Sequence, residues 1–247
     1  MNLKELFLNQ CSNKKLEINN DQVHIVNLLN KFYQENFNKS FYSNLFFKNK
    51  DKNGFYLYGD VGVGKTMILN FFYDKFNQTK QRLHFNEFMI NFHNFVFCNK
   101  NNKDLNIIDI FVNDLKNNYR LIYFDEFQVT NIVDAMILGN LFKKIFNAKI
   151  KVIFSSNIKI DDLYKEGLQR DQFLPFIKIM KSFCHEEKLS IKDDYRKKQD
   201  KEDKNYFFPL NEVTNFKINK FFRKITKDKI NQEKILLIKG RKFIIKD

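Results

Sequence analysis

Short apolar runs alternate with longer amphipathic segments through the middle of the chain. Four runs bounded by glycine, polar or charged residues are typical of buried strands: 54–59, 82–85, 121–124 and 151–157. Apolar residues recurring every three or four positions predict helices over 21–37, 65–76, 86–97, 104–118, 130–146 and 161–183, the last with a break at Pro175. This alternation favours right-handed βαβ units, hence an α/β fold with a parallel sheet covered by helices on both faces.

The pattern changes after about residue 192. A charge run over 193–205 is typical of a solvated linker, and a helix over 211–227 and a hairpin around Lys239 and Gly240 are predicted beyond it. We therefore predict an N-terminal helical extension over 1–53, a core over 54–192, and a short basic α+β tail over 193–247.

Composition supports a folded chain and leaves its charge ambiguous. Of the residues, 43% are hydrophobic, 30 are Phe, and the net charge is +14. Only six of the 43 basic residues are Arg, while Lys, Asn, Ile and Phe abound, which is typical of a codon bias toward A and T. A nucleic-acid surface could give the same charge and is the less favoured interpretation.

The spacing of the cysteines and the hydropathy of the chain indicate the cellular compartment. Cys11, Cys98 and Cys184 are widely spaced without a CxxC pattern, as in reduced intracellular proteins, and their spacing with the histidines shows no metal site. The start of the chain has no apolar core of signal-peptide length, and no stretch of the sequence reaches the roughly 18 apolar residues needed to span a bilayer. We expect a cytoplasmic protein.

A glycine-rich loop carries the first chemical signal. The stretch GDVGVGKT matches the phosphate-binding pattern G-x-x-x-x-G-K-[ST] and lies between a predicted strand and a predicted helix. Its backbone N–H groups would cradle phosphate at a helix N-terminus. The nucleotide-binding residues predicted here are Gly59, Asp60, Val61, Gly62, Val63, Gly64, Lys65 and Thr66. An accidental glycine turn is the alternative.

The run LIYFDEFQVT ends a predicted buried strand on two carboxylates. Asp125 would position Mg²⁺ together with the Thr66 hydroxyl, and Glu126 would orient or deprotonate the water that attacks the γ-phosphate of ATP. An exposed strand end is the structural alternative. Asn157, at the end of the next predicted strand, is either a γ-phosphate or water contact or a turn-forming residue. The motifs of guanine-nucleotide switches, N-K-x-D and D-x-x-G, are not seen at the expected places.

Several strings together resemble the AAA+ ATPases of the ZapE type, bacterial relatives of a mitochondrial AFG-like ATPase. They are FYLYGDVGVGKTMILNFFYDKF, QRLHFNEFM, LIYFDEFQVTNIVDAMILGNLFKKIF, SSN, DDLYKEGLQRDQFLPFI and DYR, covering most of 54–196. The resemblance implies that Lys65 and Thr66 are Walker A residues, Asp125 and Glu126 Walker B, and Asn157 the first sensor. It also implies that Arg170 is an arginine finger acting on a neighbouring subunit; anchoring its own helix through a local carboxylate is the alternative.

The resemblance further implies ATP hydrolysis, with Mg²⁺, coupled to remodelling of protein partners by a ring-type homo-oligomer. Those partners would be the FtsZ division ring in bacteria and inner-membrane-associated complexes in mitochondria. Relatives continue beyond the position of Asp247 with a helical lid, so we expect weakened self-association here. Two alternatives stay open: a DNA-associated accessory ATPase similar to a helicase loader, and a degenerate nucleotide-binding scaffold.

Overall fold

A computed structural model of the chain describes residues 2–37, 52–99, 106–190, 211–226, 234–238 and 241–245. Contacts group the chain into two compact units, Met1–Tyr195 and Arg196–Asp247, each described here by itself. The helices before residue 53, predicted as an extension, belong to the same unit as the sheet. The charge run over 193–205 and the hairpin turn at 239–240 lie outside the described residues.

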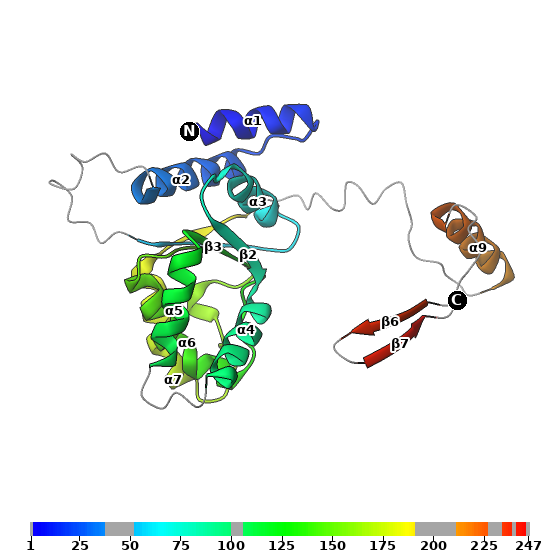
Figure 1. The fold of residues 1–247 in the computed structure, drawn as a ribbon. Helices are drawn as coiled ribbons and strands as arrows, with labels where there is room; N and C mark the ends of the chain where they lie inside the picture. Colours follow the sequence, from blue (N-terminus) through cyan, green and yellow to red (C-terminus); the bar gives the residue numbers. More distant parts are fainter. Residues whose placement is uncertain are drawn as a thin grey trace. The chain divides into compact units, whose positions relative to one another are not determined.

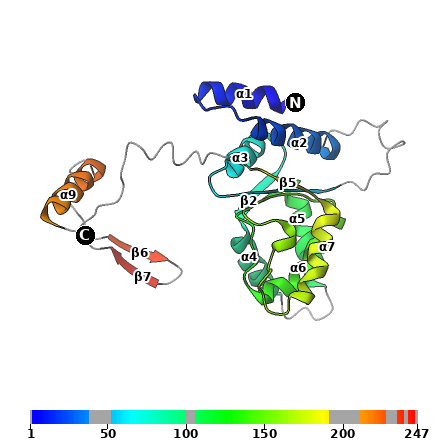
Figure 2. The same cartoon turned by 180° about the vertical axis from the view of Figure 1, so that it is seen from behind.

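The first unit is built on one parallel sheet (Figures 1 and 2). Its strands are β1 (Gly54–Tyr58), β2 (Lys80–His84), β3 (Leu121–Asp125), β4 (Lys151–Ser156) and β5 (Cys184–Lys188), in the order β2-β3-β4-β1-β5. The pairings of β1 with β4 and β5, of β2 with β3 and of β3 with β4 are all parallel. The predicted α/β class with a helix-covered parallel sheet is confirmed.

Helices cover both faces of this sheet. They are α1 (Leu3–Asn13), α2 (Asn20–Phe37), α3 (Lys65–Lys75), α4 (Phe85–Cys98), α5 (Ile107–Asn118), α6 (Ile132–Asn147) and α7 (Arg170–Phe183), with a short 3-10 helix η2 (Ile160–Asp162). In Figure 1, α1 to α3 lie on one side of the sheet and α4 to α7 on the other.

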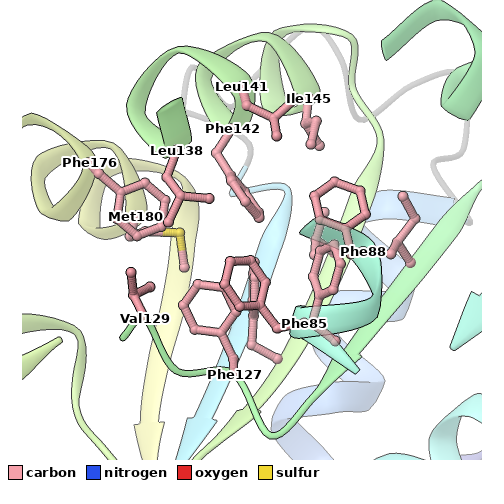
Figure 3. Packing of buried hydrophobic residues seen from close by; sticks show 14 of the residues in the cluster. Phe85, Phe88, Phe127, Val129, Leu138, Leu141, Phe142, Ile145, Phe176 and Met180 are labelled. Carbon is pink, nitrogen blue, oxygen red and sulfur yellow. The ribbon is translucent and has the colours of Figure 1, made fainter. Parts of the chain in front are cut away.

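Two hydrophobic cores follow from the alternation of side chains along the strands. Phe55 and Tyr123 point to the side of α1–α3, where Phe7 and Phe71 meet edge to face at 5.3 Å. Tyr56 and Phe124 point to the side of α4–α7 and join a cluster that includes the following residues, shown in Figure 3: Phe85, Phe88, Phe127, Leu138, Phe142, Phe176 and Met180. These Phe side chains therefore form the core of the first unit.

Three local features differ from the sequence expectations. Helix α1 was not expected, and neither was β5, whose sequence CHEEK lacks an apolar run. The predicted helix over 161–183 is wrong in its first part: η2 and a turn precede α7, which continues through Pro175. Burial of Phe173, Phe176, Ile177 and Met180 offsets the hydrogen bond that proline removes.

The second unit contains α9 (Glu212–Thr226) and an antiparallel pair, β6 (Lys234–Ile238) and β7 (Arg241–Ile245). These elements match the predicted helix and hairpin. Among the described residues of the whole chain, no helix is both long and apolar enough to cross a bilayer. All three cysteines are free thiols, with Cys11 and Cys184 buried and Cys98 exposed.

Candidate functional site

The loop between β1 and α3 has the backbone conformation of a phosphate cradle. Gly59, Gly62 and Gly64 have φ values of 154°, 92° and 92°, a region that side-chain-bearing residues rarely adopt. A Cβ on Gly59 would lie 2.1 Å from the backbone oxygen of Leu189, just after β5. Gly64 in turn precedes the first residue of α3, Lys65. The glycines thus permit both the loop's curvature and its close approach to the neighbouring chain.

Lys65 is buried inside this loop and bonds to its backbone. Its Nζ donates to the carbonyl oxygens of Gly59 at 2.8 Å and Asp60 at 2.7 Å. Thr66 is exposed in the first turn of α3, while Asp60 and Val61 are exposed at the tip of the loop. A positive charge and a hydroxyl are therefore both present where the loop's N–H groups can receive an anion.

Asp125 ends β3 as a buried carboxylate with four donors around it. One oxygen, Oδ1, accepts from Ser155 Oγ at 2.6 Å, Tyr123 OH at 3.2 Å and the Glu126 N–H at 3.2 Å. The other, Oδ2, accepts from Arg82 at 2.5 Å. Burial alone raises the pKa of this carboxyl, but the bonds from Ser155 and Arg82 outweigh it and lower the pKa. Asp125 is thus ionised at neutral pH.

Glu126 turns away from the core directly after that strand. It has φ 53°, in the left-handed region, and its side chain is 76% exposed. The next residue returns to the interior, because the Phe127 N–H donates to the Ser155 oxygen at 2.7 Å and the ring is fully buried among Phe85, Phe142 and Phe176 (Figure 3). The adjacent acids therefore have opposite environments, one buried and bonded and one presented to solvent.

Asn157 and Arg170 occupy different places relative to these groups. Asn157 is exposed immediately after β4, the strand between β1 and β3, so it shares their carboxyl edge. Arg170 begins α7 and its guanidinium donates to the backbone oxygens of Asp161 at 2.7 Å and Leu163 at 3.2 Å. The sheet thus brings together the loop, Asp125, Glu126 and Asn157, while Arg170 is tied to the η2 segment of its own chain.

Two residues at the site were missed by sequence reasoning. Arg82 on β2 forms the ion pair with Asp125, and its guanidinium also lies 5.2 Å from the centre of the Tyr123 ring. One signal was available, since arginine is rare in this lysine-rich chain. Gln22 on α2 donates to the Val63 oxygen in the loop at 3.1 Å. No motif marks Gln22 in the sequence.

His84 and His93 each lie close to an acidic side chain. His84 ends β2, and its Nδ1 lies 3.7 Å from a Glu126 oxygen. His93 on α4 pairs with Asp134 on α6 at 2.7 Å. Among the described residues, no group of three or more His, Cys, Asp and Glu side chains could hold a metal ion by itself.

The donors at the loop suit Mg²⁺ completed by substrate and water. Magnesium prefers oxygen ligands and takes few of them from protein when it is bound with nucleotide phosphates. The Thr66 hydroxyl and the ionised Asp125 carboxylate are oxygen ligands of that kind, and Asp125 Oδ2 accepts a hydrogen bond from Arg82. The residues present therefore fit the ion.

A parallel sheet in the order β2-β3-β4-β1-β5, a phosphate loop after β1 and paired acids at the carboxyl end of β3 define a P-loop ATPase of the AAA+ class. The sequence also matches the AFG1-like ATPase family over residues 1–246. The chain belongs to the AFG1-like ATPase family.

Two curated relatives illustrate the match. The chain is 34% identical over 205 residues to "Lactation elevated protein 1 homolog B" of Danio rerio, covering 78% of this chain and 41% of the relative. It is 35% identical over 176 residues to "Cell division protein ZapE" of Escherichia coli (strain K12), covering 71% of this chain and 46% of the relative. It thus spans less than half the length of either. AMPPCP-bound DnaA from Aquifex aeolicus superposes with a TM-score of 0.47 at 15% identity, over 87% of this chain and 63% of that one.

Proposed function

We propose that this chain binds ATP with Mg²⁺ and hydrolyses it as the motor of a self-associating ATPase that remodels protein partners. The observation that carries the proposal is the divergence of Asp125 and Glu126 at the end of β3. One carboxylate is buried and held ionised, as a metal positioner must be, and the other is 76% exposed, as a base acting on water must be.

In the proposed site the loop glycines and Lys65 hold the phosphates. Lys65 would exchange its bonds to the Gly59 and Asp60 oxygens for bonds to β- and γ-phosphate oxygens. The Thr66 hydroxyl and Asp125 would hold Mg²⁺, which supplies charge neutralisation at those phosphates when bound. Because the pKa of Asp125 is already lowered, no proton would have to leave this carboxyl when the ion binds.

Glu126 is proposed to accept the proton of the attacking water, with Asn157 orienting that water or the γ-phosphate. The water oxygen bonds to the γ-phosphorus, and the bond from that phosphorus to the bridging oxygen of ADP breaks. A positioned general base contributes about 10²- to 10⁴-fold in rate. The exposed Asn157 at the end of β4 faces the same edge of the sheet as Glu126.

Arg170 is proposed to act on nucleotide bound to a neighbouring subunit. Leu168, two residues before Arg170, is 76% exposed, and an exposed apolar side chain near an arginine is a combination suited to a subunit contact. An arginine finger supplied in trans contributes about 10³- to 10⁵-fold. Its bonds to Asp161 and Leu163 would have to open on assembly.

The protein partner is proposed from the relatives. One of them is named a cell division protein, and the ZapE-type resemblance implies the FtsZ ring as substrate. Inner-membrane-associated proteins are the corresponding partners implied for mitochondrial relatives. A cytoplasmic location, consistent with three free thiols, is part of this proposal.

The test is ATPase rate per subunit against protein concentration for wild type, Glu126→Gln and Arg170→Ala. We expect the wild-type rate to rise with concentration, Glu126→Gln to bind ATP yet lose about 10²- to 10⁴-fold in rate, and Arg170→Ala to lose the concentration dependence. Lys178→Ala, an exposed lysine on the same helix as Arg170, is the matched control. A wild-type rate at background throughout would instead support a nucleotide-binding scaffold.

A second candidate function, association with nucleic acid, is favoured by the distribution of charge. Residues 196–247 hold 16 basic and 7 acidic residues, a net +9, whereas residues 1–195 hold 27 and 22, a net +5. A uniform codon bias would spread lysine evenly along the chain. The concentration of positive charge in the second unit therefore favours an anionic partner.

The face of α9 formed by Val213, Phe216, Lys217 and Lys220 suits single-stranded nucleic acid in particular. All four are exposed, Phe216 by 71%, and their spacing places the aromatic ring among the lysines. Single-strand binders combine stacking rings with cations in this way, whereas membrane-surface helices separate the two.

A labelled single-stranded oligonucleotide, titrated at several salt concentrations, tests this candidate. Phe216→Ala should weaken binding by about 5- to 100-fold through lost stacking, and Lys217→Ala should flatten the salt dependence by about 0.7 per charge. Lys4→Ala on α1, also exposed, should change neither. Binding that stays weak as salt is lowered would remove the candidate.

A further inference from the structure

The amide of Gln22 is a buried polar group that the ATPase mechanism above does not use. Its side chain is 2% exposed, it lies in the first turn of α2, and its Nε2 donates to the Val63 oxygen of the phosphate loop at 3.1 Å. These residues are 41 positions apart in the chain. The contact therefore links the N-terminal helices directly to the nucleotide site.

Gln22 is held rigidly where it meets the loop. The side chain of Asn19 caps α2 by accepting from the N–H groups of Asp21 at 2.8 Å and Gln22 at 3.3 Å. Further along the helix, Ile25, Val26 and Leu29 are buried against the core that α3 shares. The backbone that carries the Gln22 side chain is therefore fixed by the cap at the start of α2 and by burial of the rest of the helix.

The Gln22 amide also occupies the space beside a glycine of the loop. A Cβ on Gly64, whose φ is 92°, would lie 2.7 Å from Gln22 Nε2. Close approach of the amide thus depends on the missing side chain at Gly64. Val63 is itself 3% exposed, so its carbonyl oxygen is bonded within the protein interior.

The direction of the Val63 carbonyl matters for phosphate binding. A loop can present its N–H groups to an anion only if its carbonyl oxygens point elsewhere, because an oxygen turned toward phosphate would repel it. A carbonyl that points away from the cradle into the protein interior needs a hydrogen-bond donor there, because a buried polar group without a partner is destabilising. Gln22 supplies that donor, and this keeps the loop in the phosphate-accepting arrangement before nucleotide arrives.

We propose that Gln22 is a positioning residue. By binding the Val63 carbonyl oxygen it keeps that carbonyl turned away from the phosphate cradle, so that the loop is ready to bind ATP. Without this hydrogen bond, the carbonyl of the empty loop can turn into the cradle and bond to water there. The turn costs no free energy until a phosphate has to displace the carbonyl. Loss of Gln22 therefore penalises the nucleotide-bound form more than the empty one. The inference rests on the proposed ATP binding.

The experiment measures the ATP dissociation constant and the thermal midpoint without nucleotide for wild type and Gln22→Met. Methionine keeps the volume and removes the donor. We expect the dissociation constant and KM for ATP to rise about tenfold, equivalent to about 1.4 kcal/mol. The kcat at saturating ATP should stay within about twofold of wild type, because the ground state and the transition state lose the same contact. The nucleotide-free midpoint should change far less than the nucleotide-induced shift.

Asn27→Ala, an exposed amide on the same helix, is the matched control and should bind ATP as wild type does. If Gln22→Met is too unstable to titrate, Gln22→Asn, which withdraws the amide by one methylene, is measured with the same criteria. Unchanged ATP affinity in the measured variant overturns the inference while wild-type binding stands. Absence of ATP binding by the wild type would instead refute the proposed function.

Discussion

At the scale of single residues, the bond from Ser155 and the ion pair with Arg82 together keep Asp125, the proposed metal-positioning acid, ionised. Asp125 is nearly inaccessible, and a buried carboxylate is costly unless charged or polar donors surround it. Arg82 is 38% exposed and reaches in from β2, stacking on the Tyr123 ring on the way. Its charge compensates Asp125, while its stem covers an aromatic surface.

We predict that Arg82→Met lowers the free energy of unfolding at pH 7 by about 1–2 kcal/mol, allowing for the partial exposure of the pair. The folded-state pKa of Asp125 is lowered, so its stabilisation is present above the unfolded value near 3.8 and is lost as pH falls through the lower folded value. The difference between variant and wild type should therefore shrink in acid, as measured by urea unfolding between pH 3 and 7.

Arg82→Lys is the control for that prediction. Because lysine keeps the charge but not the planar fork, this variant should fall between wild type and Arg82→Met. A destabilisation by Arg82→Met that is the same at every pH would instead mean that packing on Tyr123, and not the ion pair, is what arginine contributes.

At the scale of elements, the connection from β1 to α3 is constrained by β5. The Leu189 N–H donates to the Tyr58 oxygen at 2.8 Å, so the chain leaving β5 runs closely beside the start of the phosphate loop. Gly59 stands at this crossing with φ 154°. The edge strand β5, which the sequence pattern did not predict, thus helps to shape the phosphate loop, which the sequence did predict.

We predict that Gly59→Ala destabilises the fold by about 2–4 kcal/mol and abolishes ATP binding. A Cβ there meets the Leu189 backbone oxygen at 2.1 Å, and alanine disfavours this φ. Thermal unfolding and nucleotide titration would measure both effects.

Gly139→Ala on α6 is the matched control. Its Cβ would meet its nearest atom, the Phe176 backbone nitrogen, at 3.9 Å, an ordinary contact, and the residue lies inside a helix. That variant should therefore be more stable by about 0.5–1 kcal/mol. Equal effects of the two substitutions would contradict the assignment of strain to Gly59.

At the scale of the whole molecule, each predicted catalytic and nucleotide-binding residue lies in the unit Met1–Tyr195. The helices α1 and α2 are integral to that unit, because Leu3, Phe7, Ile25 and Phe32 are each no more than 2% exposed within the same core as α3. The second unit carries most of the net positive charge instead.

We predict that a chain ending at Tyr195 folds and binds ATP with wild-type affinity. A chain beginning at residue 52 should lose folding cooperativity, because removal of α1 and α2 uncovers one face of the sheet and takes Gln22 from the loop. Calorimetry and nucleotide titration of the two truncated chains would check this. Loss of ATP binding on removal of residues 196–247 would contradict it.

The sequence by itself determined the local chemistry: the glycine loop from Gly59 to Thr66, the acids Asp125 and Glu126, and the alternation that predicts a parallel sheet. Such features depend on short spacing and on side-chain type, so they survive without coordinates. The family strings also carried the assignment to AFG1-like ATPases, which the match over residues 1–246 confirms.

Tertiary structure decided the pairings that set how those residues are held. Arg82 lies 43 positions from Asp125, and Gln22 lies 41 positions from Val63, so their contacts depend on strand order and helix packing. The strand β5 is read from its pairing with β1, since CHEEK has no periodic signal. Likewise, the opposite environments of Asp125 and Glu126 accompany a left-handed φ at Glu126, between buried Asp125 and buried Phe127.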